Sequence, residues 1–204
     1  MFEDRQEAAE RLAQALDRLR DQHPLVLAIP RGGVPMGRVI ADLLTGDLDV
    51  VLVRKIGAPG NPEYAIGAVS EDGSVHLEEA AQQCRDDWLA SEVAEQRELI
   101  EERRRRYTPV RAPLDPAGRV VVVVDDGSAT GATMAAALAT LRQRQPARLI
   151  AALGVAPPDT LARLEELADE VVCLEAPAYF RAVGQYFANF GQVSDDEVIR
   201  LLGG

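Results

Sequence analysis

Uninterrupted apolar runs alternate along the chain with segments in which apolar residues recur every three or four positions. The first pattern is typical of strands buried on both faces of a sheet, and the second is typical of helices that cover it. The predicted strands are residues 25–29, 48–53, 119–124, 148–155 and 170–174, and the predicted helices are residues 3–20, 35–44, 78–107, 132–144 and 158–168. This alternation predicts an α/β fold with a mostly parallel, twisted sheet flanked by helices.

Turn-forming residues interrupt the pattern between the second predicted strand and the long helix. Residues 54–66 contain two glycines and two prolines and are expected to be irregular. An Asp-Gly pair at 72–73 predicts a hairpin turn, and the helix at 78–107 is expected to break near its start. Ser194 and Glu197 have the spacing of a capping box, which predicts a short last helix.

The segment 120–134 combines a strand with chemical groups suited to a ligand. Five valines are followed by Asp125 and Asp126, by a turn of glycines and hydroxyl side chains, and by a strong helix former. Backbone N–H groups, hydroxyls and the helix N-terminus make an anion cradle that suits a phosphate monoester. The carboxylates would repel that phosphate, so we expect them to face sugar hydroxyls or a cation on the same ligand. The segment therefore predicts a site for a ribose 5-phosphate.

Other motifs with similar parts do not fit this segment. It lacks the lysine of a P-loop, the alternating acids of an aspartyl phosphatase and the later acidic ligands of an EF-hand. The remaining alternative is an acidic turn that caps a core strand and binds no ligand.

The run of an apolar strand, two acids and a Thr-Gly-x-Thr loop resembles the ribose-phosphate signature of type I phosphoribosyltransferases. The resemblance implies that Asp125 and Asp126 contact the ribose 2′- and 3′-hydroxyls of 5-phosphoribosyl 1-pyrophosphate. It also implies Mg²⁺, which these two acids would bind directly or through water. The loop implied to hold the 5′-phosphate consists of Gly127, Ser128, Ala129, Thr130, Gly131, Ala132 and Thr133.

Two further segments are expected at the same edge, because ligands bind at the carboxyl ends of parallel strands. Arg31 follows the first predicted strand and offers a fork of donors to phosphate oxygens, while Gly32 and Gly33 allow close approach of the backbone. The resemblance implies that this loop binds the diphosphate. Arg54 and Lys55 follow the next predicted strand, where they would neutralise the diphosphate or merely be solvated. The candidate catalytic residues are Asp125, Asp126, Arg31 and Lys55.

The resemblance further implies a small hood over the site and a flexible loop that closes on it. We expect residues 1–174 to form the α/β core and residues 175–204, which are rich in aromatic side chains, to form the hood or tail. Residues 1–20 and 78–107 are candidates to contribute to the hood. The flexible loop is expected at residues 57–64.

Composition narrows the partners. The 204 residues are 47% apolar and 27% charged, as in ordinary folded proteins. A formal net charge of −11 argues against nonspecific binding to nucleic acid, whose phosphates attract Lys and Arg.

Cys84 and Cys173 suggest neither a disulfide framework nor a metal site. No signal peptide or membrane-length apolar run is evident, so a cytoplasmic protein without membrane partners is expected. Four consecutive arginines at 103–106 favour a solvated helix face over a phosphate or partner patch.

Two departures from the family's well-known branches leave the acceptor open. Ala129 occupies a loop position that is acidic in purine-salvage members, and residues 56–66 lack the basic side chains of the orotate branch. We therefore predict a phosphoribosyltransferase of nucleotide metabolism that uses an unidentified nitrogenous acceptor and releases pyrophosphate; a homo-oligomer is compatible with the sequence. The alternatives are a non-catalytic regulatory module that binds the donor or a nucleotide, and a sugar-phosphate hydrolase that uses water.

Overall fold

The computed structural model describes residues 1–203, without the side chains of residues 62 and 63. Within that range, five parallel strands form the main sheet in the order β2-β1-β6-β7-β8. The strands are β1 (Leu25–Ala28), β2 (Asp47–Val50), β6 (Val120–Gly127), β7 (Arg148–Val155) and β8 (Glu170–Glu175). The chain runs outward from β1 to β2, returns to β6 on the other side of β1, and continues outward to β8. The predicted α/β fold with a mostly parallel sheet is confirmed.

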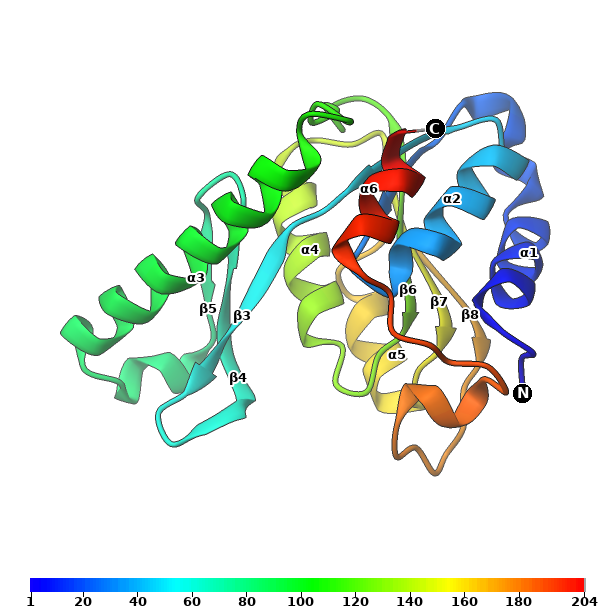
Figure 1. Ribbon diagram of the computed structural model, residues 1–204. Coiled ribbons are helices and arrows are strands. Elements are labelled where there is room, and N and C mark those ends of the chain that lie inside the picture. The colour runs from blue at the N-terminus through cyan, green and yellow to red at the C-terminus, as the bar shows by residue number, and fades with distance from the viewer. Residues whose placement is uncertain (204) are drawn as a thin grey trace.

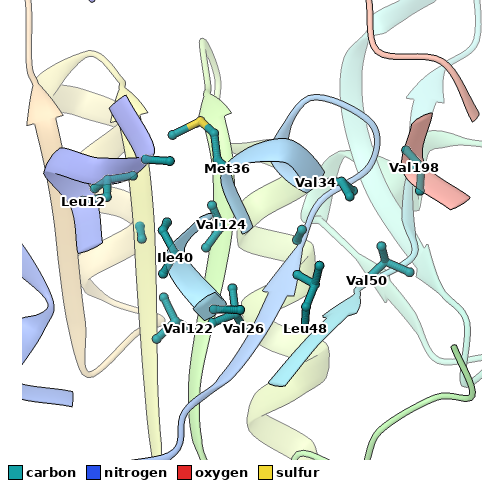
Figure 2. Packing of buried hydrophobic residues seen from close by; sticks show 14 of the residues in the cluster. Leu12, Val26, Val34, Met36, Ile40, Leu48, Val50, Val122, Val124 and Val198 are labelled. Carbon is teal, nitrogen blue, oxygen red and sulfur yellow. The ribbon is translucent and has the colours of Figure 1, made fainter. Parts of the chain in front are cut away.

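Helices cover both faces of this sheet (Figure 1), because successive strand residues point to opposite sides. The helices over one face are α1 (Arg5–Ala15) and α2 (Gly33–Leu43), with α6 (Asp195–Gly203) beside α2; those over the other are α4 (Ala132–Gln143) and α5 (Pro158–Glu165). Val122 and Val124 belong to the core beneath α1 and α2 (Figure 2), whereas Val121 and Val123 belong to the core beneath α4. The five valines therefore serve both cores.

A second, antiparallel sheet projects to one side of the main sheet together with the longest helix (Figure 1). Its elements are β3 (Val53–Ala58), β4 (Asn61–Ser70) and β5 (Val75–Leu77), followed by the 3-10 helix η2 (Glu79–Gln83) and by α3 (Asp86–Tyr107). The prediction that residues 54–66 are irregular is wrong. Gly60, with a φ of 76°, forms the turn between β3 and β4, while Ile56 and Ile66 are buried in the same core as Ile100 of α3.

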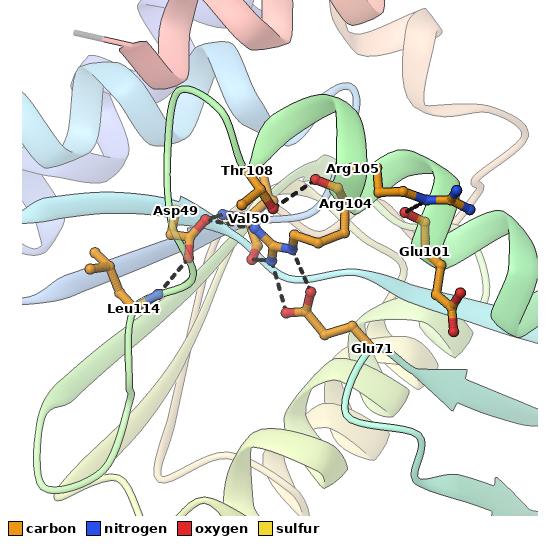
Figure 3. Close-up of polar contacts among 8 residues, drawn as sticks. All are labelled: Asp49, Val50, Glu71, Glu101, Arg104, Arg105, Thr108 and Leu114. Atoms are coloured by element: carbon orange, nitrogen blue, oxygen red, sulfur yellow. Dashed lines mark hydrogen bonds and ion pairs between the residues drawn. The ribbon is translucent and has the colours of Figure 1, made fainter.

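Arg104 anchors α3 to the main sheet (Figure 3). Its guanidinium donates to both carboxylate oxygens of Glu71, at 2.7 and 2.9 Å, and to Oδ1 of Asp49 in β2, at 3.3 Å. The other carboxylate oxygen of Asp49 accepts from the backbone N–H of Leu114 at 2.9 Å. The prediction of one solvated face at residues 103–106 is wrong, because the Arg104 side chain is only 13% exposed and is paired with two acids.

Three local predictions are confirmed. Gly73, with a φ of 83°, forms the hairpin turn between β4 and β5. The long helical segment is broken near its start, where η2 ends and α3 begins. Ser194 caps α6, because its Oγ accepts from the N–H of Glu197 at 3.1 Å. Among residues 1–203, no helix combines the length and apolar character needed to cross a membrane.

Candidate functional site

The loops that follow β1 and β6 meet at the point where the strand order reverses. A Cβ atom on Gly33 would lie 2.5 Å from the carbonyl oxygen of Val124, and one on Gly32 would lie 2.2 Å from Oδ2 of Asp126. Only glycine fits at either position without displacing its neighbour. In open α/β sheets, such a switch point is where ligands bind. The structure therefore brings residues 30–33 against the predicted acids.

The other sequence-predicted residues lie in four elements. Asp125, Asp126 and Gly127 end β6; Ser128, Ala129, Thr130 and Gly131 form the following loop; Ala132 and Thr133 begin α4; Arg54 and Lys55 lie in β3. The prediction that Arg54 and Lys55 begin a loop after a strand of the main sheet is wrong, because β2 ends at Val50 and the chain then pairs with β4. Arg31 lies exposed in the loop after β1.

The loop after β6 is held by side chains on its own and a neighbouring segment. Gly131, with a φ of 73°, is the N-cap of α4, and its N–H donates to Oγ of Ser128 at 3.0 Å. From α5, Thr160 Oγ1 donates to the carbonyl of Ala129 at 2.8 Å. Gly131 has no side chain to bind the N–H groups of the second and third residues of α4, so these groups can serve an anion. The loop is therefore held in place at a helix N-terminus, where an anion can be bound.

The two acids at the end of β6 are buried side by side, and the charge of Asp126 opposes the ionisation of Asp125. Asp126 is 8% exposed, and Asp125 Oδ1 accepts from the Asp126 backbone N–H at 2.9 Å. Burial, followed by the charge of Asp126, raises the pKa of Asp125 well above its usual range. Burial also raises the pKa of Asp126, although the Arg5 cation opposes this effect. Two such carboxylates would be stabilised by hydroxyl donors or by a cation.

Arg5 is the residue of this site that sequence reasoning missed. Its Nε and Nη2 lie 2.9 and 2.8 Å from Oδ2 of Asp126, and its Nη1 donates to the carbonyl of Gly191 at 2.8 Å. The guanidinium carbon also lies 4.0 Å from the centre of the Phe190 ring. No local pattern signals this pairing, because the partners come from distant parts of the chain.

Comparison with known families agrees with the fold and the motif. Residues 2–187 match the family model described as the phosphoribosyl transferase domain. The chain therefore belongs to the phosphoribosyl transferase domain family, which confirms the family resemblance found at residues 120–134.

Similar proteins are known from Mycobacterium tuberculosis and Thermus thermophilus. The Mycobacterium tuberculosis proteins "Putative phosphoribosyl transferase Rv0571c" (strain ATCC 25618 / H37Rv) and "Putative phosphoribosyl transferase MT0597" (strain CDC 1551 / Oshkosh) are each 43% identical over 205 residues, which cover 99% of this chain and 46% of theirs. The chain thus spans about half the length of these relatives. The crystal structure of TT1426 from Thermus thermophilus is 46% identical, with a TM-score of 0.90, and covers 100% of this chain and 98% of that one.

Proposed function

We propose that the chain transfers the phosphoribosyl group of 5-phosphoribosyl 1-pyrophosphate to a nitrogenous acceptor and releases pyrophosphate. The observation that carries the proposal is the close contact of residues 30–33 with the end of β6, at the switch point of the sheet. The donor has a phosphate, a ribose diol and a diphosphate. The cradle, the acid pair and an arginine-bearing loop offer one complementary group for each.

Each part of the donor has a proposed set of partners. The hydroxyls of Thr130 and Thr133 and the N–H groups at 129, 130 and 133 would hold the 5′-phosphate. Asp125 and Asp126 would accept hydrogen bonds from the ribose hydroxyls. The diphosphate would be bound by Arg31, the backbone at Gly32 and Gly33, and the cations Arg54 and Lys55. The division into a core at 1–174 and a hood at 175–204 stays a prediction.

The acid pair also fits Mg²⁺. Among the side chains that the structure describes, no three His, Cys, Asp or Glu residues gather as a ready-made metal site. Mg²⁺ is often held by one or two carboxylates together with substrate phosphates, so a two-acid site would suffice. The raised pKa values of Asp125 and Asp126 mark a place where a cation would stabilise both charges. When bound, Mg²⁺ would neutralise part of the diphosphate charge.

The reaction would break the bond between C1 of the ribose and the diphosphate oxygen. The diphosphate would leave with the electron pair of that bond. The acceptor nitrogen would form the new bond to C1. Arg31, Arg54 and Lys55 would stabilise the negative charge that grows on the leaving group, and the acid pair would orient the ribose. Ala129 offers no proton to an acceptor ring, so the acceptor would need to be reactive without help from this loop position.

A turnover screen tests the proposal. Pyrophosphate release would be measured with donor, Mg²⁺ and a panel of heterocycles, in the parent and in Asp126→Asn. One heterocycle is expected to give turnover, and Asp126→Asn is expected to weaken donor binding while Asp21→Asn, an exposed acid elsewhere, does not. Release without any acceptor would favour the hydrolase alternative. Tight donor binding without release would favour the regulatory module, and no binding of the donor would refute the proposal.

A further inference from the structure

A small cavity of about 90 Å³ lies between α3, β3 and the start of α6. Its polar lining consists of three arginines and two acids. The residues that line it are Arg54, Leu99, Glu102, Arg103, Arg106 and Asp195. The cavity is outside the acid pair and the phosphate cradle already described.

The two acids of this cavity are engaged by one of its arginines. Arg106 Nη2 lies 2.8 Å from Oε1 of Glu102, and its Nη1 lies 3.2 Å from Oδ2 of Asp195. Among the side chains that the structure describes, neither Arg54 nor Arg103 forms an ion pair with a carboxylate. The cavity therefore contains two cations whose charge is not matched by direct contact with an acid.

Arg54 and Arg103 come from different elements and repel each other. Arg54 is held in place by a hydrogen bond from its Nε to Oε1 of Gln96, at 2.6 Å. Burial, and after it the charge of Arg103, lowers the pKa of Arg54, while Glu95 and Glu92 partly oppose this. Holding two like charges together costs free energy unless an anion lies near both.

The charge of Arg31, in the loop after β1, acts on a hydroxyl at the wall of the cavity. The hydroxyl of Tyr107 donates to Oδ1 of Asp195 at 3.0 Å, at the wall of the cavity. Burial and the contact with Asp195 raise the pKa of Tyr107 to about 12, and the charges of Arg103 and Arg31 both oppose that rise. Arg31 and Arg103 therefore act on the same hydroxyl from two elements.

We propose that Arg103, together with Arg54, binds the outer phosphate of a diphosphate group whose inner phosphate lies at Arg31. The inference rests on the proposed function and extends the donor site to helix α3. It assigns to one of the four consecutive arginines a binding role, while Arg104 holds the helix in place. Two guanidinium groups offer the forked donors that phosphate oxygens accept.

Calorimetric titration with two probes tests the inference. Inorganic pyrophosphate represents the diphosphate end, and ribose 5-phosphate represents the end that the loop at 127–133 would hold. Arg103→Gln is expected to weaken pyrophosphate binding about 10-fold, as expected for a lost charge-assisted contact, and to leave ribose 5-phosphate unchanged. Arg105→Gln is the matched control, because Arg105 is exposed on the same helix and bonds the carbonyl of Glu101. It is expected to change neither affinity.

The outcomes distinguish a failure of the inference alone from a failure of the proposed function. If the parent binds ribose 5-phosphate and Arg103→Gln binds pyrophosphate as the parent does, the inference is overturned and the proposed function stands. If the parent binds neither probe, both fall. Should Arg103→Gln unfold at a lower temperature, Arg103→Lys decides instead. It retains the charge but not the fork, so a pyrophosphate affinity equal to that of the parent overturns the inference, and a weaker one supports it.

Discussion

Arg5 and Asp126 form a two-nitrogen ion pair across 121 positions of the chain, with Nε and Nη2 of the arginine 2.9 and 2.8 Å from one carboxylate oxygen. Their side chains are only 13% and 11% exposed. The Arg5 cation lies beside the acid pair and partly offsets the burial that raises the pKa values of Asp125 and Asp126. The first turn of α1 is thus part of the site wall.

We expect Arg5→Gln to destabilise the protein by about 2–4 kcal/mol, because it leaves a buried carboxylate without its charge-assisted partner. The unfolding midpoint would fall by about 2–4 °C for each kcal/mol in a chain of this size. Arg11→Gln is the control, because Arg11 lies on the same helix with ion pairs at 3.8 and 3.9 Å. Equal midpoints for the two variants would show that the Arg5 pair contributes nothing measurable.

We expect Asp125→Asn to stabilise the free protein at neutral pH. Burial raises the pKa of Asp125 in the folded state above its ordinary value of 3.8, so the folded chain holds a proton that the unfolded chain loses. The stability that this residue contributes therefore falls as the pH rises from the pKa of Asp125 in the unfolded chain through its pKa in the folded chain. Asparagine removes that loss and still offers an oxygen to the Asp126 N–H.

The midpoint of Asp125→Asn should exceed that of the parent at about pH 7 and match it at about pH 3, where both states are protonated. Each kcal/mol relieved would add about 2–4 °C. Asp21→Asn, at an exposed site, is expected to show no such difference. A midpoint below that of the parent at neutral pH would mean that the ionised carboxylate is stabilised by its surroundings.

Gly33→Ala should disrupt the contact between the two site loops. The added Cβ would lie 2.5 Å from the carbonyl oxygen of Val124, which is backbone and cannot move aside at low cost. Overpacking of this kind typically costs about 1–3 kcal/mol. Gly191→Ala is the control, because no atom lies within 4 Å of its Cβ position. The unfolding midpoint and the affinity for ribose 5-phosphate would be measured. If Gly33→Ala matched the control variant in both quantities, the close contact would be contradicted.

Thr160→Val should loosen the loop after β6 without touching a ligand. It removes the hydrogen bond from Thr160 Oγ1 to the Ala129 carbonyl, at 2.8 Å, for a cost of about 1 kcal/mol in stability. We expect ribose 5-phosphate affinity to fall several-fold, because the loop is then less well organised. Thr108→Val, at the end of α3, removes another threonine hydroxyl bond far from the loop and should leave that affinity intact. An unchanged affinity in both variants would show that α5 does not position the loop.

Local sequence patterns predicted the elements whose own residues specify a strand or a turn. Five valines between polar segments specify a strand buried on both faces, and a glycine with Asp before it specifies the turn at 72–73. The strands at 54–66 were missed because their glycines and prolines favour turns, whereas burial of Ile56 and Ile66 in a core shared with α3 stabilises the pairing. That packing depends on residues far along the chain.

The candidate site was likewise predicted where its residues are contiguous and missed where they are distant in the sequence. Asp125, Asp126 and the loop that follows them are contiguous, so their spacing could be recognised in the sequence. Arg5 reaches the site only through tertiary packing, and nothing near residue 5 indicates it. The four arginines at 103–106 look alike in the sequence, but successive helical residues lie on different faces of α3. Arg104 therefore points toward Asp49 and Glu71, whereas Arg105 is exposed (Figure 3).

Arg5 leaves the ribosome long before the groups that complete its surroundings. Its carboxylate partner is made 121 residues later, and Gly191, whose carbonyl accepts from Nη1, is made 186 residues later. Because folding during synthesis begins with N-terminal segments, α1 is translated well before its first side chain can find both partners. A growing chain can therefore form the first turn of α1 while Arg5 still lacks both of its polar partners. The ion pair that borders the two acids can form only after residue 126 has been translated, and the bond to residue 191 only later still.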